Sequence, residues 1–203
     1  QIITRGITEL SNFIEIVITP KKHCMFNYKD VKELERLTPR AFEKAMKDLL
    51  QCLGLKNLRV IGGPRDEGVD ITCTMKKSGI VFRIIVQCKR WRKKKIDPKV
   101  IREFIGTLVT KRRRNEVVIG ILITTTELTR EAKKHIAEVR RSHSGIIVEA
   151  IDKIKLANII ANIRQEKEVN IFDIIGLNKL LGSVIGSFSR SYRNNHRKEY
   201  LLS

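Results

Sequence analysis

Three polar residues that suit metal and phosphate chemistry stand close together in this sequence. Asp70 ends the run Gly68-Val69-Asp70, and Gln87 and Lys89 flank Cys88 at the end of an apolar, β-prone run over 80–86. Side chains alternate between the two faces of a strand, so Gln87 and Lys89 share one face and Cys88 lies on the other.

The residues between these two groups predict how they meet. Lys76-Lys77-Ser78-Gly79 is typical of a tight turn, which indicates a hairpin of two antiparallel strands over about 69–75 and 80–89. Pairing across this hairpin would bring Asp70 close to Gln87 and Lys89. A carboxylate, an amide oxygen and an ammonium on one patch supply oxygen ligands for a hard cation and a positive charge beside a phosphate. These are the requirements of metal-assisted phosphodiester cleavage.

The elements that position this patch follow from apolar periodicity and capping residues. Thr38-Pro39 predicts the start of a helix that Gly54 ends, and 58–61 predicts a strand before the hairpin. Further helices are predicted to begin at Pro98, after Thr129 and near Asp152, and further strands over 117–123 and 146–150. A weak strand over 13–18 is expected in the N-terminal part. The order predicts an α/β fold.

The charge of the chain favours a polyanionic partner. Of its 203 residues, 41 are Lys or Arg and 22 are Asp or Glu, which gives a net charge of +19. Between residues 83 and 114 there are 13 basic residues and only two acids, Asp97 and Glu103. Nucleic acid is therefore favoured over a membrane surface, because no basic amphipathic helix with an aromatic face is present. If about six phosphates are neutralised, affinity should fall about a thousandfold between about 50 and 200 mM salt.

The cysteines and the lengths of the apolar runs indicate which cellular compartment to expect. The four cysteines, Cys24, Cys52, Cys73 and Cys88, lack Cys-x-x-Cys spacing, so we expect free, buried thiols in a reducing cytoplasm, with neither a disulfide framework nor a zinc site. Apolar runs shorter than about 18 residues predict neither a signal peptide nor a membrane-spanning helix.

Four stretches of the sequence form a recognisable set: 37–43, 62–70, 86–91 and 123–125. Together they resemble the Mrr-type restriction endonuclease domain of the PD-(D/E)xK nuclease superfamily, and the resemblance covers about 37–164. Residues 100–106 resemble the helix that follows in the family. The resemblance to this family implies a restriction-endonuclease-like three-layer core (αβββαβ), with a mixed central sheet flanked by helices. We expect an N-terminal extension (1–37), a nuclease domain (38–165) and a basic C-terminal extension (166–203).

The resemblance also implies roles for individual residues. Asp70 would bind Mg²⁺ or Mn²⁺ directly, Gln87 would stand where many relatives have Glu or Asp, and the backbone carbonyl of Cys88 would add a third oxygen. Lys89 would orient the attacking water and stabilise the transition state, and Glu43 would approach from the first helix. The expected DNA contacts are Arg65, Arg90, Arg92, Lys93, Lys94 and Lys95.

Reasoning from the residues alone leaves alternatives open. Asp66 and Glu67 are carboxylates in the same loop as Asp70 and would serve equally well as ligands. Glu43, three residues before Met46, fits the boundary of an amphipathic helix as well as it fits a site. A neutral Gln87 in place of a carboxylate predicts weak binding of the metal, in the millimolar range.

Three functions remain in competition at this stage. The first is a metal-dependent DNA endonuclease of the restriction or genome-defence type, which we expect to act as a homodimer because cutting both strands requires two active sites. The second is a structure-specific nuclease that cuts Holliday junctions. The third is a DNA-binding module without catalysis. Asp70 and Lys89 together favour an enzyme. RNA is disfavoured, because aromatic residues make up only 5% of the chain.

Overall fold

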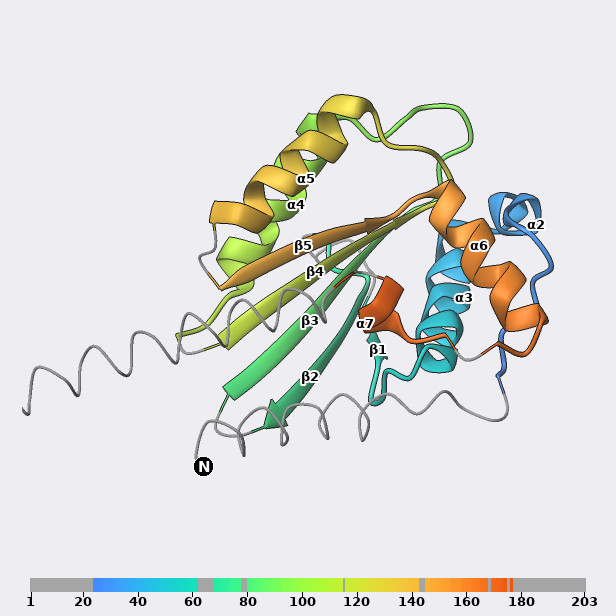
Figure 1. Ribbon diagram of the computed structural model, residues 1–203, viewed down its shortest axis with the longest axis horizontal. Helices are drawn as coiled ribbons and strands as arrows, with labels where there is room; N and C mark the ends of the chain where they lie inside the picture. Colours follow the sequence, from blue (N-terminus) through green and yellow to red (C-terminus); the bar gives the residue numbers. More distant parts are fainter. Residues whose placement is uncertain are drawn as a thin grey trace, which may run out of the picture.

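A mixed five-stranded sheet forms the centre of the protein (Figure 1). The computed structural model describes residues 24–61, 68–77, 80–114, 116–142, 145–167, 169–174 and 176. The strands are β1 (Arg59–Val60), β2 (Ile71–Lys77), β3 (Ile80–Lys89), β4 (Glu116–Thr124) and β5 (Ile146–Ile151), in the spatial order β1-β2-β3-β4-β5. Strands β1, β2 and β3 pair antiparallel, whereas β3, β4 and β5 pair parallel.

Helices cover both faces of this sheet and give three layers (Figure 1). On one face, α4 (Pro98–Lys111) and α5 (Arg130–Ser142) share a core with side chains of β3, β4 and β5. On the other face, α3 (Pro39–Cys52) and α6 (Lys153–Arg164) form a second core with the opposite side chains of the sheet. The predicted α/β architecture, with its mixed sheet and flanking helices, is confirmed.

Capping side chains explain why the helices begin where they do, and the sequence predicted the one at Thr38. Thr38 Oγ1 accepts a hydrogen bond from the backbone N–H of Ala41 at 3.2 Å, and Pro39 occupies the first turn of α3. Asp97 and Asp152 cap α4 and α6 in the same way. Gly54, with a φ of +98°, follows the end of α3, where a left-handed conformation favours glycine.

The buried strand β4 also needs a glycine for packing. Its apolar side chains serve both faces of the sheet, as the continuous apolar run predicts. At Gly120 a Cβ atom would lie 2.3 Å from Leu108 Cδ1, so the absence of a side chain lets α4 approach the sheet closely.

Two helices were not predicted. The helix α2 (Val31–Arg36) precedes α3 and buries Val31 and Leu34 in the same core as α3, so part of the predicted N-terminal extension packs on the core. The helix α7 (Ile171–Ile174) follows α6, and Ile171 is buried. The strand predicted over 13–18 and most of the C-terminal extension lie outside the described residues. None of the described helices is both long and apolar enough to cross a membrane.

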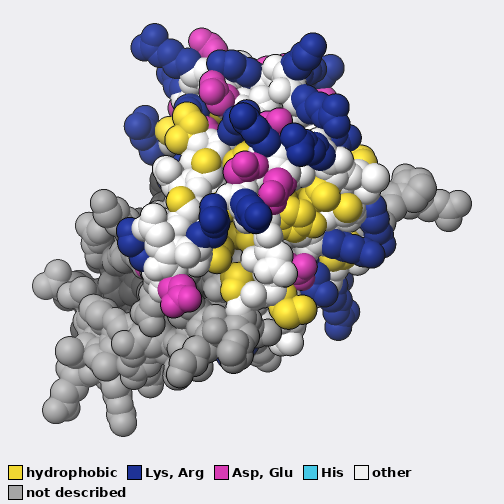
Figure 2. All heavy atoms as spheres, turned by 90° about the vertical axis from the view of Figure 1, so that its right-hand side faces the viewer, with side chains coloured by type: hydrophobic (Ala, Val, Ile, Leu, Met, Phe, Trp, Pro, Cys, Tyr) yellow, Lys and Arg dark blue, Asp and Glu magenta, His cyan; other side chains and the backbone are white. Residues whose placement is uncertain are grey.

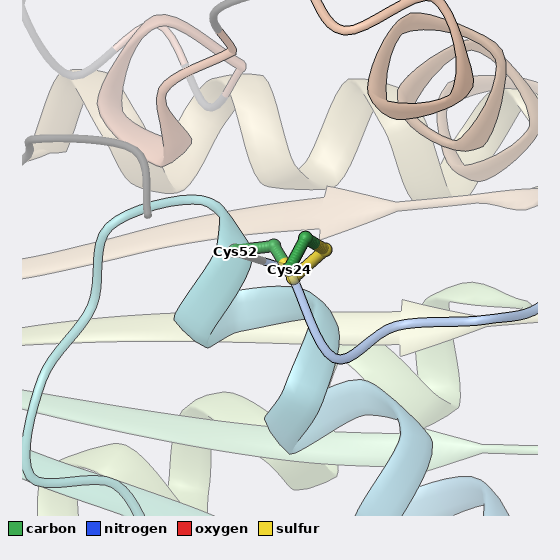
Figure 3. The surroundings of a disulfide bond; sticks show 2 residues. All are labelled: Cys24 and Cys52. Atoms are coloured by element: carbon green, nitrogen blue, oxygen red, sulfur yellow. A yellow bond between two sulfur atoms is a disulfide. The ribbon is translucent and has the colours of Figure 1, made fainter. Parts of the chain in front are cut away.

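The cysteine prediction is wrong for one pair. Cys24, before α2, and Cys52, at the end of α3, form a disulfide between residues 28 positions apart in the chain (Figure 3). The spacing gave no sign of it, because the two thiols meet only when the segment before α2 packs back along α3. Cys73 and Cys88 are free thiols, as expected. Burial raises the pKa of the Cys73 thiol to about 12.

Candidate active site

The sequence-predicted residues gather at one edge of the sheet. Strands β3, β4 and β5 are parallel, so their carboxyl ends, at Lys89, Thr124 and Ile151, all lie at this edge. The antiparallel strand β2 begins here, which places Asp70 beside the end of β3. The carboxyl ends of parallel strands are a common location for ligand sites in α/β folds.

Asp70 is held from both sides by backbone pairing. Its N–H donates to the carbonyl of Val86 at 3.0 Å, and its carbonyl accepts from the N–H of Ile61 at 2.8 Å. The paired register of β2 and β3 begins at Ile71, which pairs with Val86, so Asp70 lies directly before the paired stretch and beside the end of β3. The Asp70 carboxylate in turn accepts a hydrogen bond from the backbone N–H of Cys88 at its Oδ2, 2.5 Å away.

That bond also indicates where the Cys88 carbonyl points. In a strand the N–H and C=O of one residue lie on the same side of the chain. Since the Cys88 N–H faces Asp70, the Cys88 carbonyl lies on the Asp70 side too. The carboxylate and this carbonyl are therefore adjacent.

Gln87 is buried, with 7% of its surface exposed, and its amide has one clear orientation. Its Nε2 donates to the carbonyl of Gly68 at 2.9 Å. A carbonyl only accepts, so the NH₂ end must face Gly68 and the Oε1 end must face away. Gly68 itself has a φ of +80°, and a Cβ atom there would lie 2.5 Å from Gln87 Nε2. Glycine at 68 is thus required by both backbone and space.

The buried thiol of Cys88 is affected by several charged groups. Burial first, and then the negative charges of Asp70 and Glu43, raise the pKa of this thiol well above its usual value, while Lys89 opposes them. Cys88 packs against the core on the face of the sheet that α3 covers, and α3 is the helix that carries Glu43. Its side chain is only 14% exposed, and Arg40 Nη1 lies 3.6 Å from its Oε2.

Lys89 is the last residue of β3, and the end of β4 fixes its backbone. Thr124 Oγ1 donates to the Lys89 carbonyl at 2.8 Å, and Thr125 Oγ1 donates to the carbonyl of Trp91 at 2.6 Å. Both threonines are almost fully buried. Sequence reasoning noticed this pair only as part of a resemblance and gave it no role; a run of threonines closing an otherwise apolar strand was the available signal. Among the described residues Lys89 forms no ion pair.

The expected DNA-binding residues fall into distinct environments. Arg90 Nη1 and Arg92 Nε both donate to the backbone carbonyl of Glu35, at 3.1 and 3.2 Å. Lys95 pairs with Glu127 at 2.9 Å, whereas Lys93 and Lys94 are exposed. Arg65 lies outside the described residues, as do Asp66 and Glu67. Figure 2, which faces the right-hand side of Figure 1, shows Lys and Arg side chains gathered over the upper part of this face.

The long basic stretch between residues 83 and 114 does not lie at the site as a whole. Arg83 is six residues before Lys89, about 20 Å along the strand, and it binds Glu116 through two parallel hydrogen bonds of 2.9 and 2.8 Å. Arg112 donates to the carbonyl of Glu116 at the same end of the sheet. The stretch therefore divides between opposite ends of the strands.

The oxygen atoms at the site fit a hard divalent cation. The set consists of one carboxylate (Asp70), one amide oxygen (Gln87) and one backbone carbonyl (Cys88), and oxygen ligands of this kind suit Mg²⁺ or Mn²⁺. Among the residues that the structure describes, no three His, Cys, Asp or Glu side chains gather to hold a metal. Two of the three oxygens are neutral, so the set differs from a cluster of acidic side chains.

Comparison with known protein families shows which family this chain belongs to. Residues 34–160, more than half of the chain, match the family of Mrr catalytic domains described as restriction endonuclease. The chain belongs to this Mrr-type restriction endonuclease family. No curated protein and no solved structure was found to match it.

Membership of the Mrr-type family sets what the protein does at a coarse level. The family consists of nucleases of the restriction-endonuclease type, so the protein is a nuclease whose substrate is DNA. The matched region begins within α2, ends within α6 and contains Asp70, Gln87 and Lys89. The family match and the clustering at the sheet edge thus concern the same part of the chain.

Proposed function

We propose that the protein is a metal-dependent DNA endonuclease of the restriction or genome-defence type, and that Glu43, Asp70, Gln87 and Lys89 form its active site. The observation that carries the proposal is the convergence at the end of the β2–β3 hairpin. There the Asp70 carboxylate accepts a hydrogen bond from the Cys88 N–H, and the Gln87 amide donates one to the Gly68 carbonyl. Lys89 is the last residue of β3, the strand that carries Gln87 and Cys88.

A divalent cation fits the oxygens on the Asp70 side of β3. Asp70, the Oε1 of Gln87 and the Cys88 carbonyl would hold it. When bound, the cation acts as a Lewis acid on the phosphate and lowers the pKa of water near it. With only one charged oxygen among the three, we expect millimolar metal to be required.

The residues of the chain divide the remaining work of hydrolysis. In this reaction a water oxygen bonds to phosphorus, one P–O ester bond breaks, and a proton ends on the departing oxygen. Lys89 places a positive charge beside the phosphate, where negative charge grows in the transition state. Glu43, only partly exposed on α3, lies close enough to influence Cys88 and would orient the attacking water.

The decisive experiment is cleavage of supercoiled plasmid, both methylated and unmethylated, beside a four-way junction. Each substrate is incubated with Mg²⁺, with Mn²⁺ or with EDTA. The active protein should cut only with metal, and Asp70→Asn and Lys89→Met should each lower the rate by about a hundredfold or more. Glu131→Gln, which removes an exposed carboxylate in the first turn of α5, is the matched control.

The outcomes separate the competing functions. Preferential cutting of the junction would identify a structure-specific nuclease instead of a restriction-type enzyme. Intact DNA binding without cutting of any substrate would identify a non-catalytic binding module. Cutting that persists in Asp70→Asn would show that the loop carboxylates Asp66 and Glu67 replace it.

A homodimer follows from the proposed chemistry, because one active site cuts one strand at a time. We expect sedimentation equilibrium to give twice the 23.4 kDa chain mass for the protein, plus the mass of the duplex when DNA is bound. A monomer that still makes double-strand breaks in a single binding event would contradict this expectation.

A further inference from the structure

An open depression borders the proposed active site directly after Lys89. Its volume is about 540 Å³, and among the described residues it is lined by Arg90, Trp91, Arg92 and Lys94. Three of these four side chains carry a positive charge. Lys94 Nζ lies 5.2 Å from the centre of the Trp91 ring, over its face, so the two side chains form a cation–π contact.

Within the described part of the chain, the two arginines are oriented by a neutral group and have no acidic partner. Both donate to a single acceptor, the backbone carbonyl of Glu35 in α2. A carbonyl oxygen is neutral, so it fixes the guanidinium groups and leaves their charges uncompensated. The carboxylate of Glu35 does not balance them, because it pairs with Lys153 at 2.9 Å.

This arrangement holds like charges together, and several of their N–H donors have no partner among the residues that the structure describes. Each guanidinium has five N–H donors, and each uses one on Glu35. Arg90 Nε is buried and has no hydrogen-bond partner among the described residues. Lys95, in the same loop, shows the contrast: its charge is compensated by Glu127. A group with several acceptor oxygens and a negative charge would satisfy both the charges and the donors.

We propose that this depression binds a phosphate of the DNA backbone that neighbours the phosphate being cut. The inference rests on the proposed function, since it takes the scissile phosphate to lie beside Lys89. Arg92 and Lys94 contact the neighbouring phosphate directly, and Arg90 adds a third positive charge to the same depression. Planar guanidinium groups recognise phosphate through paired N–H donors, so the site fixes the register of the strand in addition to adding affinity.

The competing explanation is purely structural: the arginines only attach α2 to the loop after β3. Arg92→Gln separates the two roles, because glutamine keeps a donor for the Glu35 carbonyl but removes the charge. Lys56→Gln, at an exposed lysine in the turn after α3, is the matched loss of one charge away from this depression.

The test measures binding of a labelled duplex by fluorescence anisotropy in EDTA, where no cutting takes place. We expect Arg92→Gln to weaken binding about tenfold and to reduce the slope of log affinity against log salt by about one. Lys56→Gln should change affinity much less. Urea unfolding of both variants shows whether either has lost stability.

A second arm identifies the phosphate. Single phosphates in the duplex are replaced, one at a time, by uncharged methylphosphonates. At one position beside the cut the replacement should weaken binding by the wild-type protein but cause no further loss with Arg92→Gln. Independent losses at every position, or unchanged binding by Arg92→Gln, would overturn the inference.

The two proposals fail in different ways. If binding shows this non-additive loss but the protein never cuts DNA, the phosphate site stands and the proposed catalysis is refuted. If the protein cuts DNA with metal but no phosphate position is non-additive with Arg92→Gln, the catalysis stands and the phosphate site is refuted.

Discussion

The buried contact between Gln87 and Gly68 makes Gln87→Glu an informative substitution. A carboxylate at 87 would place an oxygen where Nε2 now stands, 2.9 Å from the Gly68 carbonyl. The hydrogen bond, worth about 1 kcal/mol, would be lost, and a buried acceptor without a donor costs about 1–3 kcal/mol more. We therefore expect the free energy of unfolding to fall by about 2–4 kcal/mol in the absence of metal.

Metal should reverse part of this loss. The added negative charge binds a divalent cation more tightly than a neutral amide does, and a ligand that binds only the native state stabilises it. A tenfold tighter site would return about 1.4 kcal/mol at saturating metal. Gln87→Met, which removes the same hydrogen bond without adding charge, is the control that metal should not rescue.

Urea unfolding in EDTA and in about 10 mM Mg²⁺ measures both effects. With a typical slope of about 2 kcal/mol per molar urea, the midpoint of Gln87→Glu in EDTA should lie about 1–2 M below that of the wild type. Equal stability of the two proteins in EDTA would refute the claim that Gly68 fixes the amide. Equal rescue of Gln87→Met by Mg²⁺ would refute the claim that residue 87 lies at the metal.

Three further predictions concern the surroundings of the site. Cys24→Ser should lower the free energy of unfolding by about 3–4 kcal/mol under oxidising conditions, since the disulfide closes a 28-residue separation, and by much less with reductant present. Hydrogen bonds from Arg83 lower the pKa of Glu116, so the native state binds fewer protons there than the unfolded chain does. This contribution is present above the ordinary value of 4.5 and is lost as pH falls through the lowered pKa. Glu116→Gln should therefore be less stable at pH 7 in thermal unfolding and lose less stability on acidification. Thr124→Val removes the donor to the Lys89 carbonyl and should lower stability by about 1–2 kcal/mol. If Thr124 also positions Lys89 for the reaction, kcat should fall while KM stays constant, and an unchanged kcat would leave it a purely structural role.

Local signals in the sequence account for most of the fold that was predicted correctly. Caps such as Thr38-Pro39 and Asp97-Pro98 each depend on residues within one helical turn, and strand alternation alone placed Gln87 and Lys89 on one face. The missed helix α2 has a local signal as well. Asp30 accepts from the Glu33 N–H, and Glu33 accepts from the N–H of Lys29, a reciprocal cap that could have been read from the residues.

Features that depend on distant parts of the chain were not predictable in this way. The roles of Thr124 and Thr125 appear only once β4 lies parallel to β3 and their ends coincide. The Cys24–Cys52 disulfide requires the segment before α2 to return to the end of α3. The need for glycine at position 68 depends on the Gln87 amide, which lies against it from another strand. Each is a contact between segments whose proximity comes from tertiary packing.

The division of the basic stretch changes the expected salt dependence of DNA binding. Arg83 is neutralised by Glu116, Lys95 by Glu127, and Arg112 lies at the far end of the sheet. The basic residues at the active-site edge without an acidic partner among the described residues are Lys89, Arg90, Arg92, Lys93 and Lys94. If each neutralises one phosphate, the slope of log affinity against log salt is about −4.5 per chain, a loss of about five-hundredfold between about 50 and 200 mM salt. Anisotropy titrations over that range measure the slope. A slope near zero would refute the placement of DNA on this edge, because no arrangement of these charges on a phosphate backbone avoids releasing counterions.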